Sequence, residues 1–224
     1  MRKKNLLSWS SGKDSAWALH VLRQDPQVEV VGLFATVNKL FERVAMHGVR
    51  VELLRQQAAS AGLPLHLIEI PYPCSDAEYA EAMTSFIDAA VQEQIECFAF
   101  GDLFLEDVRQ YREKNLDGTG ITPIFPLWGI PTGELSGEMV SGGLKAVLTC
   151  VDPKRIPDTF AGKEFDTAFL DALPEGVDPC GEYGEFHSFA YDGPMFQSPI
   201  GISVGETVRR DGFVFTDVKP ASSL

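Results

Sequence analysis

The sequence has few cysteines and no long apolar run, and both shortages exclude classes of protein. The four cysteines among 224 residues are scattered without a Cys-x-x-Cys pair, so we expect neither a zinc knuckle nor a disulfide framework. No apolar stretch approaches membrane-spanning length, and the one after the basic N-terminus is too short for a secretion signal. We therefore expect a cytoplasmic protein without membrane contact.

Basic residues are also in short supply. Lysine and arginine number 19 against 32 aspartates and glutamates, which gives a formal net charge of −13. A field of this sign opposes attraction to a phosphodiester backbone, so a nucleic-acid partner is disfavoured. Two familiar phosphate-binding patterns, the Walker A loop and the Gly-x-Gly-x-x-Gly turn, are absent as well.

The sequence does contain a run of small residues, Ser8-Trp9-Ser10-Ser11-Gly12-Lys13-Asp14-Ser15, between a short apolar segment and an amphipathic one. This position predicts a helix N-terminus, whose free N–H groups and positive dipole end attract phosphate. A simple helix cap is the alternative, but a cap requires one such residue rather than six. The expected nucleotide ligands are Ser8, Ser10, Ser11, Gly12, Lys13, Asp14 and Ser15.

Apolar runs and amphipathic segments alternate through residue 115. Runs at 5–9, 28–34, 65–70 and 97–100 predict buried strands, with helical patterns between them. This order predicts an α/β fold with a parallel sheet flanked by helices. Glycine and proline crowd the chain after residue 118, where 144–151 is the clearest strand. We predict a nucleotide-binding domain at 1–118 and a smaller, irregular α+β substrate domain at 119–224.

Ligands of open parallel sheets bind beyond the carboxyl ends of the strands. This rule brings the 8–15 loop, the Thr36–His47 segment and Gly101-Asp102 to one edge, so all three are expected at the nucleotide. Thr36, Asn38 and His47 are expected near the adenosine, although Asn38 and His47 also suit a turn or a cap.

A second cluster of reactive side chains lies between Asp178 and Ser188. It holds three carboxylates, His187 and Cys180 among glycines typical of a loop. Such a set suits Mg²⁺ binding, or binding and deprotonation of an ammonium nucleophile. The alternatives are a solvated acidic loop and, less favoured because the ligand spacing is unfamiliar, a zinc site.

Together the two segments resemble the diphthine-ammonia ligase family of PP-loop ATP pyrophosphatases. Residues 10–15 match its Ser-Gly-Gly-Lys-Asp-Ser loop, and Gly181–His187 match its Gly-Glu-x-Gly-Glu-[Phe/Tyr]-His segment. Ser11 replaces the first glycine of the loop, which matters if that position requires a positive φ. Supporting matches are Met46–Val49, Gly101-Asp102 with Arg109 and Arg112, Phe125–Gly129, Asp178–Cys180 and Asp192–Phe196.

The resemblance implies a HUP-type nucleotide domain and a two-step amidation with ATP and Mg²⁺. ATP would adenylate a substrate carboxylate and release pyrophosphate, and ammonia would then displace AMP to leave an amide. Lys13 and Asp14 are the expected catalytic residues at the phosphates, and Asp14 is the candidate Mg²⁺ ligand. The acceptor carboxylate is unidentified, and in the family it belongs to a modified histidine on a translation factor.

The resemblance also assigns roles in the second half of the chain. Glu182, Glu185 and His187 would receive ammonium and relay its proton. Expected substrate contacts are Arg109, Arg112, Gly181, Tyr183 and Gly184. The two arginines could clamp the substrate carboxylate or the α-phosphate, and they could equally be helix-surface charges paired with Glu106 or Glu113.

Two other functions compete with the ligase. A PP-loop sulfur transferase acting on RNA would need paired cysteines and a basic surface, which this sequence lacks. A non-catalytic ATP- or AMP-binding module would have no need of the 182–187 cluster. The sequence leaves the oligomeric state open between a monomer and a homodimer.

Overall fold

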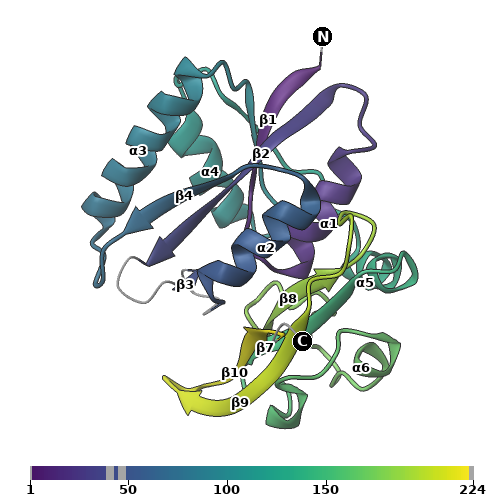
Figure 1. The fold of residues 1–224 in the computed structure, drawn as a ribbon. Helices are drawn as coiled ribbons and strands as arrows, with labels where there is room; N and C mark the ends of the chain where they lie inside the picture. The colour runs from purple at the N-terminus through teal and green to yellow at the C-terminus, as the bar shows by residue number, and fades with distance from the viewer. Residues whose placement is uncertain (1, 39–42, 45–48, 222–224) are drawn as a thin grey trace.

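The computed structural model describes residues 2–38, 43–44 and 49–221 (Figure 1). Within these residues, the first half of the chain forms a six-stranded sheet. Five strands are parallel, in the order β4 (Leu65–Ile70), β2 (Val28–Asn38), β1 (Lys3–Ser8), β5 (Cys97–Ala99) and β6 (Thr122–Ile124). The short β3 (Arg43–Val44) pairs antiparallel with the end of β2. The predicted parallel α/β sheet is confirmed.

Helices cover both faces of this sheet (Figure 1). Helices α3 (Asp76–Gln92) and α4 (Glu106–Leu116) pack on one face, where Ile87 and Leu116 join Phe34 and Phe98 in an apolar cluster. Helices α1 (Lys13–Leu22) and α2 (Val51–Ala61) cover the other face. Alternate residues of each central strand therefore enter two separate cores, as the continuous apolar runs predict.

Local signals fix the ends of two helices. Gly62 ends α2 with a φ of 68°, a left-handed conformation that glycine adopts without a Cβ penalty. Ser75 and Glu78 form a reciprocal capping box at the start of α3. The sequence predicts both features.

The second half of the chain forms a four-stranded antiparallel sheet. Its strands lie in the order β8 (Phe186–Asp192), β7 (Lys145–Val151), β10 (Phe213–Pro220) and β9 (Ile202–Arg210). Helices α5 (Thr132–Ser141) and α6 (Thr167–Asp171) and a 3₁₀ turn at Asp158–Phe160 accompany it. The predicted strand at 144–151 is β7. The glycines that favour irregular structure lie largely in turns between regular strands. The domain boundary at residue 118 stays a prediction.

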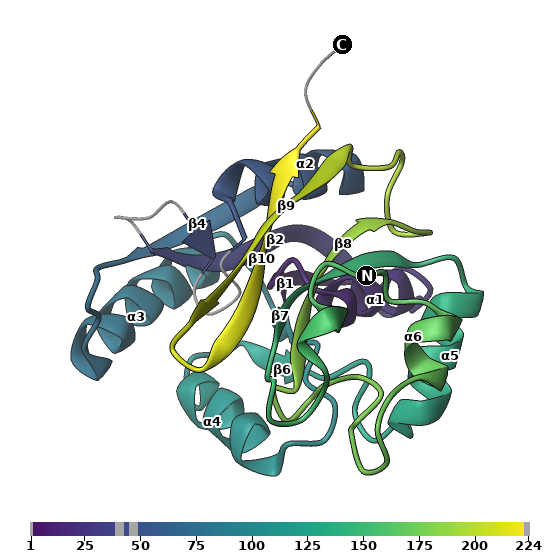
Figure 2. The same cartoon turned by 90° about the horizontal axis from the view of Figure 1, so that it is seen from below.

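The two sheets share one apolar core. In Figure 1 the chain enters β1 at the top, and the second sheet lies at the bottom, beyond the carboxyl end of β1; Figure 2 views the same arrangement from below. Leu7 and Leu19 of the first half belong to the same buried cluster as Val147 and Phe189 of the second. No helix among the described residues is long and apolar enough to cross a membrane.

Candidate functional site

A cavity of about 610 Å³ lies where the two sheets meet. Its walls include the loop after β1, the segment that follows β5, the loop before β8 and the start of β8 itself. Fourteen of the residues expected at the site line this cavity, and they are Ser8, Ser10, Gly12, Lys13, Asp14, Ser15, Gly101, Asp102, Arg112, Gly181, Glu182, Tyr183, Gly184 and His187.

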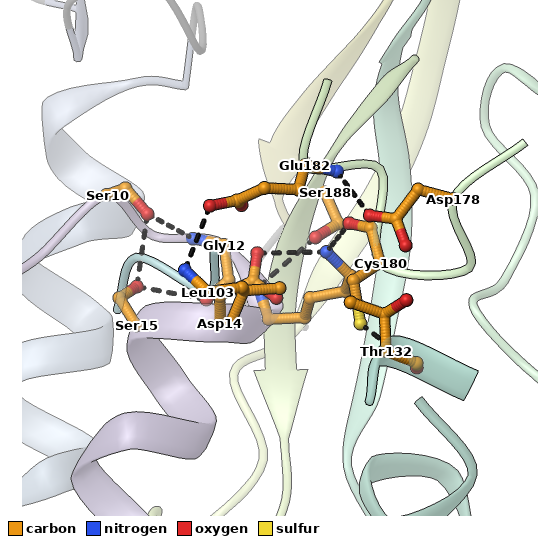
Figure 3. A network of polar contacts seen from close by, with 11 residues as sticks. Ser10, Gly12, Asp14, Ser15, Leu103, Thr132, Asp178, Cys180, Glu182 and Ser188 are labelled. Carbon is orange, nitrogen blue, oxygen red and sulfur yellow. Dashed lines mark hydrogen bonds and ion pairs between the residues drawn. The ribbon is translucent and has the colours of Figure 1, made fainter. Parts of the chain in front are cut away.

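The loop at residues 8–15, which the sequence predicts to bind phosphate and which we call the phosphate loop, is held by hydrogen bonds between its own residues. The Gly12 N–H donates to Ser10 Oγ over 3.4 Å, and Ser15 Oγ donates to the Gly12 carbonyl over 3.0 Å (Figure 3). A Cβ at Gly101 would lie 3.1 Å from the backbone of Asp14 and Ser15. Glycine at position 101 therefore lets the chain after β5 pack closely against the N-terminus of α1.

Ser11 adopts the conformation that the family glycine would take. Its φ is 70°, so the loop does require a left-handed residue at this position. For a residue with a Cβ this conformation costs roughly 1–2 kcal/mol. The Ser11 side chain is fully buried, and its carbonyl accepts a hydrogen bond from the Ala190 N–H of β8 over 3.0 Å. The second sheet therefore helps to hold this strained residue.

Lys13 is turned toward the second half of the chain. Its side chain is 2% exposed, and Nζ donates to the Cys180 carbonyl and to Asp14 Oδ2, the latter over 2.9 Å. The ring centres of Phe165 and Phe186 lie 5.6 and 5.1 Å from Nζ. Burial is the largest single influence and favours neutral lysine, but the negative charge and hydrogen bond of Asp14, together with other acidic groups nearby such as Glu182, outweigh it and raise the pKa of Lys13. The lysine is thus a buried cation that joins the loop to Cys180.

Asp14 has the one feature of the loop that fits a metal ion. Its Oδ1 is buried and accepts no hydrogen bond from any residue that the structure describes. Carboxylate oxygens are preferred Mg²⁺ ligands, and Mg²⁺ typically takes one or two of them together with phosphate and water oxygens. No group of three or more candidate metal ligands is found among the described residues, and the Mg²⁺ site at Asp14 stays a prediction.

Glu182 and His187 face the cavity with shifted pKa values. Glu182 Oε1 accepts from the Leu103 N–H over 2.9 Å, and its own N–H donates to Asp178 Oδ2 over 2.7 Å (Figure 3). Burial raises the pKa of Glu182 to about 7. Burial, aided by the positive charge of Lys13, lowers the pKa of His187 to about 4. At neutral pH the site therefore offers a neutral imidazole and a carboxyl group close to half ionisation.

Known families match both halves of the chain. A model of the diphthamide synthase N-terminal domain matches residues 3–123, and a model of the diphthamide synthase C-terminal domain matches residues 132–224. The chain belongs to the diphthamide synthase family. The family is one of ATP-dependent ligases.

Relatives of this diphthamide synthase family member carry a ligase name. The diphthine–ammonia ligase of Danio rerio is 29% identical over 177 residues, which cover 72% of this chain and 69% of the relative. The diphthine–ammonia ligases of Bos taurus and Homo sapiens are each 29% identical over 133 residues, 57% of this chain. That match spans 49% of each mammalian protein, about half its length.

One solved structure has a partial likeness to this family member. It is the U34-tRNA thiolase NcsA from Methanococcus maripaludis with its [4Fe-4S] cluster, 17% identical in sequence. The TM-score is 0.39, over 61% of this chain and 55% of the thiolase. A likeness of this size carries no functional conclusion.

Glu185 is placed differently from its neighbours in this diphthamide synthase family member. It is 1% exposed and is not among the residues that line the cavity. Its Oε1 lies 3.2 Å from Arg155 Nη2 and accepts from the Asp178 N–H over 3.4 Å. The structure thus brings Glu182 and His187 to the cavity and directs Glu185 into the loop behind them.

Arg109 and Arg112 also differ in whether they line the cavity. Arg112 lines the cavity, with Nε 3.4 Å from Asp102 Oδ2 and its guanidinium over the Phe100 ring. Arg109 is not among the lining residues. It pairs with Glu113 one helical turn away, with Nε and Oε1 2.8 Å apart, and stacks on aromatic rings. The helix-surface alternative describes Arg109, and the ligand-binding prediction remains open for Arg112.

The residues expected near adenosine lie apart from the cavity or outside the described residues. Thr36 and Asn38 are on β2, opposite Ile68 and Ile70 of β4, and neither is among the residues that line the cavity. His47 lies outside the described residues. The placement of Thr36, Asn38 and His47 near the adenosine therefore stays a prediction.

Sequence reasoning missed several residues at or behind the site, among them Asp152, Phe213 and Gln57. Asp152 and Phe213 line the cavity from the ends of β7 and β10, and no motif singles them out. Gln57 is fully buried behind the phosphate loop. One signal for it exists, because position 57 falls on the apolar face that α2 forms with Leu53, Leu54 and Ala61, where a polar residue needs partners.

Proposed function

We propose that this chain is an AMP-forming ammonia ligase that uses ATP and Mg²⁺. It adenylates a carboxylate, releases pyrophosphate, and then converts the acyl adenylate to an amide with ammonia. The observation that carries the proposal is the shared cavity, which is lined by the phosphate loop on one side and by Glu182 and His187 on the other. An adenylate made at the loop would already face a group able to take a proton.

In the first step, a carboxylate oxygen of the acceptor attacks the α-phosphorus of ATP. The new oxygen–phosphorus bond forms as the bond to the β-phosphate bridge breaks, and pyrophosphate takes the electron pair. The Gly12 N–H and the N-terminus of α1 stabilise the negative charge on the phosphates. Mg²⁺ bound at Asp14 Oδ1 would offset part of the same charge.

In the second step, ammonium must lose a proton before its nitrogen can attack. Glu182 suits this task because a pKa of about 7 lets it accept a proton at neutral pH and release it again. Neutral His187 can accept a hydrogen bond from the nucleophile. The nitrogen then bonds to the acyl carbon, and the carbon–oxygen bond to AMP breaks. For Glu185 we propose a supporting role through Asp178.

In the proposed reaction the acceptor must bring its carboxylate into the cavity. The relatives are named for diphthine, so we propose a modified histidine on a translation factor as the acceptor for this chain. Arg112 is the cavity cation suited to bind its carboxylate. Tyr183 is 65% exposed between Gly181 and Gly184, which suits a mouth that admits a group carried by another protein. We also propose that the reaction takes place in the cytoplasm.

The cavity thiol favours a ligase over sulfur transfer. A sulfur carrier requires a thiolate, which a low pKa provides. Burial raises the pKa of Cys180 to about 12, and its Sγ lies 3.5 Å from the Thr132 carbonyl. Cys180 is therefore a thiol at neutral pH and suits packing.

Product analysis tests the function. The protein is incubated with ATP, Mg²⁺, an ammonium salt and an elongation factor that carries diphthine, and the nucleotides are separated by chromatography. AMP and pyrophosphate that depend on ammonium and acceptor support the ligase, whereas ADP and phosphate would contradict it. Glu182→Gln should abolish amide formation, and the matched change at the exposed Glu175, Glu175→Gln, should leave it intact.

A further inference from the structure

Gln57 lies on α2, outside every motif, yet it is among the most completely buried polar residues of the described chain, at 0% exposure. We infer that Gln57 is a positioning residue, which sets the backbone of the phosphate loop for nucleotide binding through Ser11. The inference rests on the proposed function, because it assumes that this loop binds the phosphates of ATP.

Three hydrogen bonds engage the Gln57 amide. Its Oε1 accepts from the Trp9 indole over 2.8 Å. Its Nε2 donates to the Ser11 carbonyl over 3.0 Å and to the Ala190 carbonyl over 2.6 Å. An indole N–H can only donate and a carbonyl oxygen can only accept, so these partners fix which way the amide points. One side chain thus links the end of β1, the phosphate loop and β8.

The bond to Ser11 reaches the cavity through one peptide group. In a planar trans peptide, the Ser11 C=O and the Gly12 N–H point in opposite directions. Gln57 and the Ala190 N–H hold the Ser11 oxygen, and they thereby aim the Gly12 N–H at the cavity side, toward Ser10 Oγ. At 3.4 Å that internal bond is long, so a phosphate oxygen can replace Ser10 as the acceptor.

The same contacts join the loop to the strand that carries His187. Ala190 uses both its N–H and its carbonyl here, the first on Ser11 and the second on Gln57. Two residues earlier on β8, Ser188 Oγ accepts from the Lys13 N–H over 3.1 Å. Gln57 is not among the residues that line the cavity, so it acts on a nucleotide only through the backbone that it holds.

Nucleotide titrations test the inference without any need for turnover. Gln57→Leu removes all three hydrogen bonds at similar size, and Gln57→Glu keeps the acceptor for Trp9 while it loses both donors. Ser60→Ala is the matched control, because Ser60 also bonds the second half of the chain from α2, through Ser198, but does not touch the loop. Calorimetry gives the Kd of ATP and of adenosine for each folded protein.

We expect both Gln57 variants to raise the Kd of ATP about tenfold or more, as the loss of a well-formed hydrogen bond does. The Kd of adenosine, which has no phosphates, should stay within about twofold, as should both values in Ser60→Ala. An unchanged Kd of ATP in folded Gln57 variants overturns the inference. So does an equal loss for both ligands, which would indicate general loosening.

A third variant covers the case in which neither Gln57 variant folds. Trp9→Phe removes only the indole donor and loosens the amide, and it should raise the Kd of ATP about threefold. An unchanged Kd there overturns the inference. The proposed function fails separately, if the wild-type protein binds ATP but forms no AMP with ammonium and acceptor.

Discussion

At the cavity, Glu182 and His187 lie in similar buried surroundings, and burial moves their pKa values in opposite directions. Both groups are driven toward their neutral forms. The pKa of the Glu182 carboxyl group rises to about 7, close to neutral pH, whereas the pKa of the His187 imidazole falls to about 4. Of the two, Glu182 is therefore the group whose protonation changes in the physiological range.

The pH dependence of stability should reveal this shift. Between the ordinary pKa of 4.5 and the folded value of about 7, the folded protein holds a proton that the unfolded chain releases. The free energy of unfolding then falls as pH rises through this window. Glu182→Gln removes the effect, so its thermal midpoint relative to wild type should rise from pH 4.5 to pH 7 and level off above.

Thermal melts at half-unit pH steps measure this difference. Glu175→Gln provides the control, because it makes the same change at an exposed side chain that does not line the cavity. A constant difference for Glu182→Gln would show that the carboxyl group titrates at its ordinary pKa in the folded protein.

The ion pair between Glu185 and Arg155 predicts that replacing each partner lowers the free energy of unfolding by a different amount. The Glu185 carboxylate is fully buried, whereas the Arg155 side chain is 48% exposed. Arg155→Ala leaves a buried carboxylate short of a partner and should lower the free energy of unfolding by about 1–3 kcal/mol. Glu185→Gln leaves an arginine that water can solvate, so its loss should be smaller. Urea unfolding measures both, and the reverse order would contradict the buried-charge explanation.

At this scale the sequence predicts which segments meet but not how each side chain points. The loop at 10–15 and the segment at 181–188 do share one cavity, and the signature glycine correctly indicates the left-handed conformation of Ser11. Glu182 and Glu185 look alike in the sequence. Only the path of the loop, with Arg155 behind it, sends one to the cavity and the other away.

At the scale of elements, α5 contains glycines that have opposite structural roles. A Cβ at Gly142, the C-terminal cap, would lie 2.4 Å from Cη2 of Trp17 on α1, whereas a Cβ at Gly137 would meet nothing within 4 Å. Gly142→Ala should therefore lower the free energy of unfolding by about 1–3 kcal/mol through overpacking. Gly137→Ala should raise it by about 0.5–1 kcal/mol, because alanine favours a helix interior.

Chemical denaturation of both variants checks this pair. The two changes add the same methyl group at the cap and in the interior of one helix, so effects of opposite sign would support crowding at the cap, where Trp17 and the Glu138 carbonyl lie close. Equal effects would mean that the end of α5 is free to move away from Trp17.

The strands of the two sheets differ in how well the sequence predicts them. Strands β1, β2 and β5 each have neighbours on both sides in the first sheet and place residues in two buried clusters, so these segments are rich in apolar residues. Strand β9 is an edge strand with most of its residues exposed, and it offers no such run. Strand β10 buries alternate residues, but one of them is Thr216, which weakens the apolar alternation.

At the scale of the whole molecule, the continuous core predicts a single unfolding transition. Apolar residues of α1, α2, β7, β8 and β10 belong to one buried cluster, although two family models divide the chain between residues 123 and 132. Neither half can bury its share of this cluster alone. Scanning calorimetry should therefore give a van't Hoff enthalpy equal to the calorimetric one. Two resolved transitions would show that the halves unfold independently.

The hydrogen bond from Lys13 to Ser188 joins residues that are 175 positions apart. A ribosome that adds about 5–20 residues per second makes the phosphate loop first and needs roughly 10–35 s more to reach the strand that supports it. Throughout that interval the nascent chain has the loop without its contacts to Ser188 and Ala190 of β8. If this loop binds ATP as proposed, a chain that ends before Ser188 should bind the nucleotide more weakly than the full chain, and tight binding should come late in synthesis.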